Sequence, residues 1–360
     1  MKAIRLIISG GGTGGHIYPA LAIASQIKKE DKDTAILFVG AKGKMEMEKV
    51  PKAGFQIKGV WISGFQRSLS IQNLLFPFKL LVSLIQSYII IRRFKPNLVV
   101  GTGGFASGPV LKISQWLNIP TVIQEQNSYP GVTNKLLSKK VHTICVAFEG
   151  MEDYFPADKI KITGNPIRSN ICGHEFPQKA REFFGLNPNK KTLAIIGGSL
   201  GARRINELIA KKLDFIQSFE LQILWQCGEL YFDQYKEMVK DGVVIHPFIY
   251  EMHQFYSAAD FIISRAGAGS LSELFNAGKP LLIIPSPNVT ANHQYQNAVA
   301  LEKKGAAIFI EEKNLETDFE AVFNKFVSDT NLQKSMHKEL KRQARPEAAQ
   351  SIVKEINALL

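Results

Sequence analysis

One local pattern recurs along the chain of 360 residues: an apolar segment leads directly into a glycine-rich loop, and a helical segment follows. It appears at residues 4–9 and 98–100, and again at 193–196 and 261–263. Short apolar segments without alternating polar residues are typical of parallel strands buried on both faces. The pattern therefore predicts an α/β fold with doubly wound parallel sheets. Because both halves open in the same way, we expect two Rossmann-like domains facing a central cleft.

The length of the chain and one turn predict the domain boundaries. A chain of 360 residues is long for one compact core, and Gly164, Asn165 and Pro166 mark a turn near its middle. We expect an N-terminal domain over residues 1–163 and a C-terminal domain over residues 164–340. The tail is expected to be helical, with residues 341–360 crossing back to the N-terminal domain.

The net charge indicates which partners the protein favours, and the cysteine spacing indicates the redox state of its compartment. The net charge of +12 favours an anionic partner such as phosphates, nucleic acid or an acidic membrane surface, although solubility alone also accounts for it. Cys145, Cys172 and Cys227 lie far apart without a CxxC pair, which indicates neither a zinc site nor a disulfide framework. A reduced, cytoplasmic setting is expected. We expect no secretory signal and no transmembrane span.

The first glycine loop, residues 10–16, is typical of a phosphate-binding turn between a strand and a helix that is expected from Pro19 to Lys29. Its letters match GxGxxG, but the second strand ends in Gly40-Ala41-Lys42, without the acid that holds the ribose of NAD. A P-loop is excluded because no Gly-Lys-Ser/Thr ending follows. The loop therefore favours phosphate binding other than that of NAD or a P-loop.

Residues 264–297 contain the polar side chains that best indicate a ligand. A helix is expected to open near Ser270 and to stop at Gly278, with Glu273 on its first turn. That carboxylate suits a ribose diol, or simply offsets the helix dipole. Gln294, on a second helix, offers both a donor and an acceptor to sugar hydroxyls. An ordinary strand–helix–strand unit is the alternative, but a nucleotide-sugar pocket is favoured.

Residues 62–93 mix large apolar side chains with Arg67, Lys79, Arg92 and Arg93. One interpretation is a helix packed on the sheet. The other is an apolar patch with a basic rim that lies on an anionic membrane. Because residues 74–78 are strongly apolar beside a proline, the membrane interpretation is favoured.

Metal and nucleophile chemistry is weakly indicated. Asp31-Lys32-Asp33 spells DxD but lies in a charged turn, and the seven histidines form no HxxxH pair. A serine nucleophile elbow is not expected either. Covalent or metal-dependent hydrolysis is therefore not expected.

Seven motifs in order over nearly the whole chain resemble one family. They are GGGTGGH (10–16), GTGGFASGP (101–109), EQN (125–127), GNPIR (164–168), GGSLGA (197–202), SRAGAGSLSEL (264–274) and HQYQNA (293–298). Together they resemble the MurG family of N-acetylglucosaminyltransferases, which belongs to glycosyltransferase family 28 and has the GT-B fold. The resemblance implies inverting, metal-independent transfer of GlcNAc from UDP-GlcNAc to the C4 hydroxyl of undecaprenyl-pyrophosphoryl-MurNAc-pentapeptide (lipid I), giving lipid II for peptidoglycan synthesis. No cofactor is implied.

The resemblance also implies roles for individual residues. Those expected to bind UDP-GlcNAc are Thr13, Gly14, Gly15, Asn127, Arg168, Ser199, Glu273 and Gln294. Gly12, Gly103 and Gly104 are expected at the acceptor and its diphosphate, close to Thr13, Gly14 and His16. His16 is the first choice for the catalytic base, since imidazole titrates near neutrality; the alternative is a residue that only positions the diphosphate. Glu125 is the second choice.

The N-terminal domain is thereby expected to bind the acceptor and face the membrane, and the C-terminal domain to bind the donor. The membrane patch is expected to comprise Leu74, Leu75, Phe76, Phe78 and Lys79. This implies a peripheral protein on the cytoplasmic face of the inner membrane, with cell-wall synthesis proteins as possible partners. Nucleic acid is not expected, because no reading helix or aromatic sheet motif is recognisable. Another GT-B enzyme, such as a diacylglycerol glycosyltransferase or a UDP-GlcNAc 2-epimerase, and a non-catalytic nucleotide-sugar-binding protein remain as alternatives.

Overall fold

The computed structural model describes residues 4–64, 75–167, 176–289 and 292–360. The chain divides into two compact units: unit 1 comprises Met1–Ile167 with Glu347–Leu360, and unit 2 comprises Arg168–Pro346. Leu74 and Arg168, which have predicted roles, and Arg67 of the predicted basic rim lie outside the described residues.

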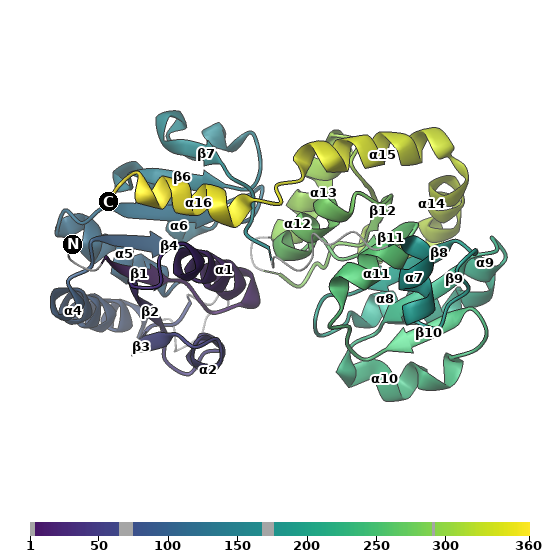
Figure 1. The fold of residues 1–360 in the computed structure, drawn as a ribbon, viewed down its shortest axis with the longest axis horizontal. Helices are drawn as coiled ribbons and strands as arrows, with labels where there is room; N and C mark the ends of the chain where they lie inside the picture. The colour runs from purple at the N-terminus through teal and green to yellow at the C-terminus, as the bar shows by residue number, and fades with distance from the viewer. Residues whose placement is uncertain (1–3, 65–74, 168–175, 290–291) are drawn as a thin grey trace. The chain divides into compact units, whose positions relative to one another are not determined.

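Unit 1 is a parallel sheet with helices on both faces (Figure 1). Its strands are β1 (Arg5–Ser9), β2 (Ala35–Ala41), β3 (Gln56–Val60), β4 (Leu98–Gly101), β5 (Thr121–Glu125), β6 (Thr143–Val146) and β7 (Ile160–Ile162). Its helices are α1 (Gly14–Glu30), α2 (Glu46–Lys52), α4 (Phe76–Phe94), α5 (Ser107–Trp116), α6 (Val132–Leu137) and α16 (Ala348–Asn357). The strand order is β3-β2-β1-β4-β5-β6-β7, with Leu6 of β1 paired to Ile36 of β2 and to Leu98 of β4.

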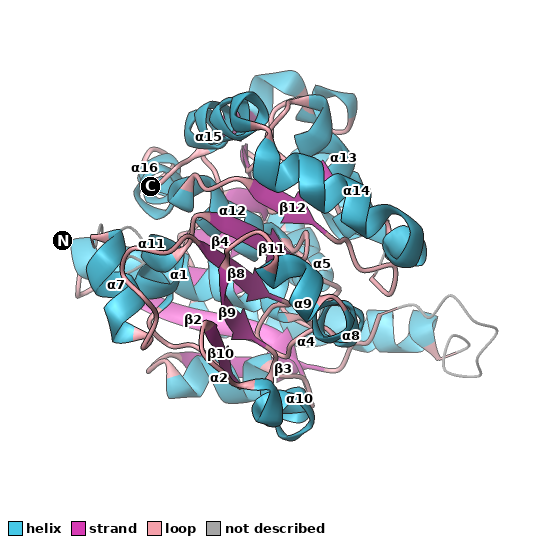
Figure 2. Ribbon diagram, turned by 90° about the vertical axis from the view of Figure 1, so that its right-hand side faces the viewer, coloured by secondary structure: helices cyan, strands magenta, loops and turns pink. Residues whose placement is uncertain are grey.

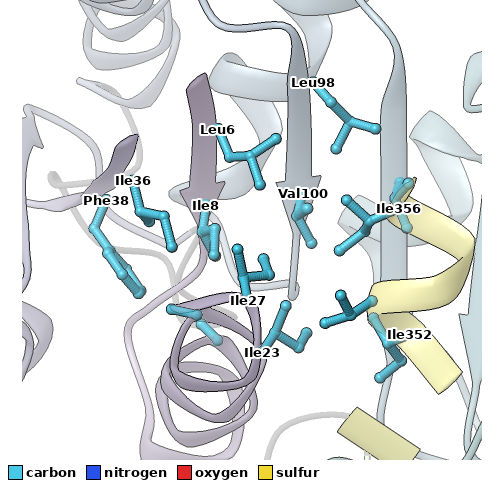
Figure 3. Packing of buried hydrophobic residues seen from close by; sticks show 14 of the residues in the cluster. Leu6, Ile8, Ile23, Ile27, Ile36, Phe38, Leu98, Val100, Ile352 and Ile356 are labelled. Carbon is cyan, nitrogen blue, oxygen red and sulfur yellow. The ribbon is translucent and has the colours of Figure 1, made fainter. Parts of the chain in front are cut away.

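The core on one face of this sheet joins the two ends of the chain (Figure 3). Ile23 and Ile27 of α1 and Ile352 and Ile356 of α16 are buried together against Ile8 and its neighbours on the strands. Burial of such side chains contributes roughly 1.5–3 kcal/mol each. This apolar contact holds α16, the last helix of the chain, in unit 1.

The structure corrects the predicted start of the first helix. The sequence predicts a start at Pro19, but α1 begins at Gly14 and contains Pro19. The N–H groups of His16 and Ile17 donate to the carbonyl oxygen of Thr13, and these bonds hold the glycines in helical conformation despite their low propensity. Gly14, Gly15 and His16 therefore form the first turn of a helix.

Unit 2 repeats the architecture. Its strands are β8 (Thr192–Ile196), β9 (Gln222–Gln226), β10 (Val243–His246), β11 (Phe261–Ser264), β12 (Leu281–Ile283) and β13 (Ile308–Phe309). Its helices are α7 (Pro177–Phe183), α8 (Arg203–Lys211), α9 (Leu213–Gln217), α10 (Glu229–Tyr235), α11 (Met252–Ala258), α12 (Ala268–Ala277), α13 (His293–Lys303), α14 (Leu315–Ser328) and α15 (Thr330–Gln343). The parallel sheet has the order β10-β9-β8-β11-β12-β13.

Figure 2 shows the strands of unit 2 between α7 and α11 on one side and α8 and α9 on the other. Helices on both faces leave the strands fully covered, which explains why β8, β9, β11 and β12 are buried along their whole length. The predicted pair of doubly wound, Rossmann-like parallel sheets is confirmed.

Candidate active site

Strand order places the glycine loops of each unit at a point where ligands commonly bind. In unit 1 the order reverses between β1 and β4, and in unit 2 it reverses between β8 and β11. Ligands of doubly wound sheets bind at the carboxyl ends of the strands at such a switch point. The four glycine-bearing loops that the sequence analysis identified follow these four strands.

His16 lies at the switch point of unit 1, on the first turn of α1. Its Nδ1 lies 3.0 Å from the carbonyl oxygen of Thr102 and 3.1 Å from Oε1 of Gln126. Nε2 of Gln126 donates to the Thr102 carbonyl at 2.7 Å, which fixes the amide with its oxygen toward the imidazole. Because both neighbours of Nδ1 are acceptors, Nδ1 carries the proton in the neutral ring. Nε2 then carries the lone pair that a general base requires.

Gly103 and Gly104 form the opposite side of this site. Both have positive φ, 94° and 79°, which strongly favours glycine. A Cβ on Gly104 would lie 2.2 Å from the carbonyl oxygen of Gly11, and a Cβ on Gly103 would lie 2.9 Å from Nδ1 of His16. The two glycine loops of unit 1 are thus close enough to exclude side chains between them.

Glu125, the second choice for a base, is already engaged by donors of its own loop. Its Oε1 accepts from the backbone N–H of Gln126 at 2.9 Å and of Asn127 at 3.0 Å. Its Oε2 accepts from the N–H of Gly131 at 3.1 Å and from Nδ2 of Asn134 at 2.8 Å. The side chain is 1% exposed. These bonds assign Glu125 to holding the loop of residues 126–131, and they do not support the alternative prediction of a base at this position.

The structure also identifies a carboxylate that sequence reasoning missed. Glu46 of α2 is fully buried beneath the first glycine loop. Its Oε2 accepts from the N–H of Gly12 at 3.0 Å and its Oε1 from that of Ala41 at 2.9 Å. Glu46 therefore shapes the first loop from below, while Thr13 and Gly15 at the top are exposed. The position of Glu46 shortly after the second strand, at the edge where ligands bind, was the sequence signal that could have identified it.

In unit 2 the loop Gly197–Ala202 follows β8, and Ser199 on it is exposed. The buried Gln226, at the end of β9, supports this loop, because its Nε2 donates to the carbonyl oxygen of Gly198 at 2.9 Å. Its Oε1 accepts from the N–H of Ile249 at 3.3 Å. One side chain that the sequence analysis did not single out thus joins the loops that follow β8 and β10.

Glu273 occupies the second turn of α12, not the first as predicted, because the helix begins at Ala268 instead of near Ser270. Gly267 is the residue that precedes the helix, and the small residues after it adopt helical conformation. Since the helix dipole acts within the first turn, dipole compensation no longer accounts for Glu273. Its Oε2 accepts a hydrogen bond from Oη of the buried Tyr256 at 2.8 Å. Gly278 ends α12 with φ 64°, as the sequence predicts.

Gln294 lies on the first turn of α13, where its Oε1 accepts from the N–H of Ser286 at 2.9 Å. Ser286 lines a cavity of about 290 Å³ together with Tyr295 and Arg204. The buried Asn297 donates through Nδ2 to the carbonyl oxygen of Ala266 at 3.0 Å, which ties α13 to the loop after β11. The bond from Asn297 therefore connects α13, which carries Gln294, to the loop that leads into α12, which carries Glu273.

No group of three or more His, Cys, Asp or Glu side chains is placed to hold a metal ion within the part of the chain that the structure describes. Burial raises the pKa of the Cys145 thiol to about 12, helped by the charge of Glu355, and burial raises the pKa of Cys227 to about 11. Both thiols are therefore protonated near neutral pH and poor nucleophiles.

Two of the three buried residues of α4 are serines, while several of its large apolar side chains are exposed. Ser83, Ser87 and Ile91 are buried. The exposed large side chains, with their exposed fractions, are Phe78 (57%), Leu81 (56%), Ile85 (53%), Tyr88 (46%) and Ile89 (42%), and Leu75 (47%) directly precedes the helix. Packing on the sheet therefore does not account for this apolar face. Across the described residues, every helix is too short or too polar to span a membrane.

Two doubly wound units, each with glycine loops at its switch point, define the GT-B class of glycosyltransferases. The crystal structure of Acinetobacter baumannii MurG matches with a TM-score of 0.80 and 28% identity over 99% of both chains. CalG4, the calicheamicin glycosyltransferase, matches with a TM-score of 0.72 over 100% of this chain and 99% of its own, and its 14% identity indicates the fold alone.

The chain belongs to glycosyltransferase family 28. The model of the family's N-terminal domain matches residues 6–146, and that of its C-terminal domain matches residues 192–352. A protein of Flavobacterium psychrophilum is 53% identical over 100% of this chain and 99% of its own length. One of Christiangramia forsetii is 51% identical over 100% and 98%. Both are named UDP-N-acetylglucosamine–N-acetylmuramyl-(pentapeptide) pyrophosphoryl-undecaprenol N-acetylglucosamine transferase.

Proposed function

We propose that the chain transfers GlcNAc from UDP-GlcNAc to the C4 hydroxyl of lipid I with inversion, giving lipid II. The observation that carries this proposal is the identity of 53% and 51%, over essentially whole chains, to proteins named for that transfer. The residues at the two switch points supply the groups that the reaction requires.

His16 is the proposed base. In an inverting displacement the acceptor oxygen bonds to C1 of GlcNAc while its proton leaves and the bond from C1 to the diphosphate breaks. Nε2 of His16 accepts that proton, since Nδ1–H is directed at Thr102 and Gln126. UDP departs with the electron pair of the broken bond. A positioned base of this kind contributes roughly 10²–10⁴-fold to the rate.

The glycine loops of unit 1 are proposed to hold the acceptor diphosphate. Gly14 and Gly15 open α1, so their N–H groups belong to the helix N-terminus, where an anion is stabilised. Gly12, Gly103 and Gly104 let the two loops approach each other closely, since a Cβ on any of them would meet the facing loop or His16. Thr13 and Asn127 border the same loops. Glu46 holds the first glycine loop through the N–H of Gly12, and Glu125 holds the loop after β5 through the N–H of Asn127.

Unit 2 is proposed to bind UDP-GlcNAc. Ser199 on the exposed glycine loop would contact a phosphate or the nucleoside, Glu273 the ribose diol, and Gln294 the GlcNAc hydroxyls. An inverting transfer without a metal needs N–H groups and an arginine at the leaving diphosphate. Arg168 is proposed for that role on the sequence resemblance alone, since it lies outside the described residues.

We further propose that α4 rests on the cytoplasmic face of the inner membrane. Its exposed apolar face is flanked by Lys79 and by Arg92 and Arg93 in its last turn, as anionic lipid surfaces require. Trp61 extends this face, because its ring lies 5.9 Å from that of Phe78, and Lys79 lies over it at 5.8 Å. A polyprenyl-linked acceptor would be reached from that position, where cell-wall synthesis proteins are also expected.

A transfer assay tests the proposed function. Radiolabelled UDP-GlcNAc is incubated with a lipid I analogue or with diacylglycerol, in the presence of EDTA. Label in the lipid I analogue alone is the expected result. Label in diacylglycerol, or epimerisation of the donor without transfer, would replace the proposal with one of those activities. Binding of UDP-GlcNAc without any turnover would indicate a non-catalytic protein.

A further inference from the structure

We propose that Tyr256 is a positioning residue for the donor: its hydroxyl holds the Glu273 carboxylate in the orientation that receives the ribose hydroxyls. This inference rests on the proposed function, in which Glu273 binds the ribose. It adds a residue that no sequence motif singled out.

The contact is a directed hydrogen bond between two helices. Tyr256 on α11 is 4% exposed, and its Oη donates to Oε2 of Glu273 on α12 at 2.8 Å. A carboxylate accepts only, so the phenol must be the donor, and a bond to a charged acceptor is about twice as strong as one between neutral groups. Burial and the Glu273 charge raise the pKa of Tyr256 well above 10.0, so the phenol keeps its proton at neutral pH.

The tyrosine ring itself is held by packing. It lies against the buried Phe255 with ring centroids 5.5 Å apart, and α11 packs against α12. Moving Oη away from Glu273 would require the ring to leave this contact. The donor that meets Oε2 is therefore fixed by the core of unit 2.

Fixing Oε2 also fixes the plane of the carboxylate and thus the direction of its second oxygen. Two vicinal hydroxyls need two acceptor sites at a set spacing, and a carboxylate offers about four lone-pair directions. With Tyr256 in place, Glu273 is already ordered before the ribose binds. The free-energy cost of ordering this side chain is therefore not subtracted from the binding free energy of the ribose. The loss of the phenol hydroxyl should then weaken ligands that carry the ribose diol and leave others unaffected.

Binding of UDP and of 2′,3′-dideoxy-UDP by titration calorimetry tests this inference in wild type, Tyr256→Phe, Glu273→Ala and the double variant. We expect UDP to bind about tenfold more weakly to Tyr256→Phe, and dideoxy-UDP to bind both proteins equally. In the Glu273→Ala background, Tyr256→Phe should change neither affinity. With UDP-GlcNAc, Tyr256→Phe should raise KM and leave kcat unchanged, because the contact is made equally in ground and transition states.

Tyr235→Phe is the matched control, since Tyr235 is a buried tyrosine of the same unit that packs on Trp225. It should bind both ligands as the wild type does. Equal weakening of UDP and dideoxy-UDP by Tyr256→Phe would overturn the inference in favour of a general packing role. Unchanged UDP affinity in Tyr256→Phe would overturn it as well. A wild type that binds no UDP at all would instead sink the proposed function.

A second substitution covers the case in which Tyr256→Phe does not fold. Incorporation of 3-fluorotyrosine at position 256 keeps the hydroxyl and the ring and adds one small atom. This protein should retain the wild-type preference for UDP over dideoxy-UDP. If the preference disappears although the hydroxyl is present, the hydrogen bond does not set it and the inference is wrong.

Discussion

Nδ1 of His16 lies 3.1 Å from Oε1 of Gln126, whose amide is fixed in turn by the carbonyl oxygen of Thr102. Gln126 comes from the loop after β5 and His16 from the first turn of α1, so the contact joins two elements of unit 1. It determines which imidazole nitrogen carries the proton, and thereby leaves Nε2 as the base.

Replacing Gln126 by Leu should therefore lower kcat, because the imidazole loses one of the two acceptors that orient it. Misorientation of a catalytic group costs up to about a hundredfold, and we expect a loss of about ten- to a hundredfold. KM for UDP-GlcNAc should not change. Gln115→Leu is the control, since Gln115 donates to a backbone carbonyl elsewhere in unit 1. Steady-state kinetics with equal kcat for Gln126→Leu and the wild type would contradict the assigned tautomer.

Glu46→Ala should destabilise the protein and weaken acceptor binding. The substitution leaves the N–H groups of Gly12 and Ala41 without their acceptor, which costs about 1–3 kcal/mol for each buried group that stays unpaired. Urea unfolding measures the stability, and KM for a lipid I analogue measures the effect on the loop.

Glu48→Ala on the same helix is the matched control, because its ion pair with Lys52 is solvent-exposed and such pairs contribute little. Equal unfolding free energies for the two variants would show that the buried carboxylate does not support the first glycine loop.

Phe78→Ser with Leu81→Ser should weaken binding to vesicles that contain anionic phospholipid. Removing two large side chains from the exposed face of α4 should reduce binding about tenfold or more, measured by vesicle sedimentation. High salt should also reduce binding of the wild type, since the basic rim is screened. Leu230→Ser is the control, because Leu230 is 82% exposed but belongs to unit 2. Unchanged sedimentation of the double variant would exclude α4 as the membrane contact.

Stability above about pH 10 should depend on Tyr256. Burial and the Glu273 charge raise its pKa in the folded state above the ordinary value of 10.0. The folded state therefore holds the phenol proton more tightly than the unfolded state does. The resulting contribution to the free energy of unfolding is fully present below pH 10.0, the ordinary pKa, and is lost as the pH rises above it. The wild type should lose up to about 1.4 kcal/mol more per pH unit than Tyr256→Phe. Urea unfolding from about pH 9 to pH 11 gives the two slopes, and parallel slopes would contradict the assignment.

The sequence predicts the repeated strand, loop and helix because buried parallel strands are continuously apolar and glycine loops interrupt them. Strands such as β8 and β11 are therefore found within one residue of their predicted ends. The sequence analysis did not predict β3, β6, β7 or β13. For β3 and β7 the reason is that their short segments, Gln56–Val60 and Ile160–Ile162, contain lysine and are partly exposed at the sheet edges.

The buried polar residues of the site were the hardest to predict. Glu46, Tyr256 and Gln226 each act through a partner distant in sequence or on another element, and no local spacing reveals such a partner. The start of α1 was misplaced because Gly14 and Gly15 have low helix propensity, whereas the bonds of His16 and Ile17 to the Thr13 carbonyl oxygen place them in the first turn. The start of α12 was misplaced by two residues, since the helix begins at Ala268, directly after Gly267.

The measurement that tests the account most directly is a single-turnover transfer of GlcNAc to a lipid I analogue by wild type and His16→Ala, with enzyme in excess. His142→Ala, a histidine of unit 1 whose Nδ1 accepts from the N–H of Thr121, is the control. We expect His16→Ala to slow transfer about 10²–10⁴-fold, with UDP-GlcNAc affinity and the control unchanged. Transfer by His16→Ala at the wild-type rate would contradict the role of Nε2 as the base.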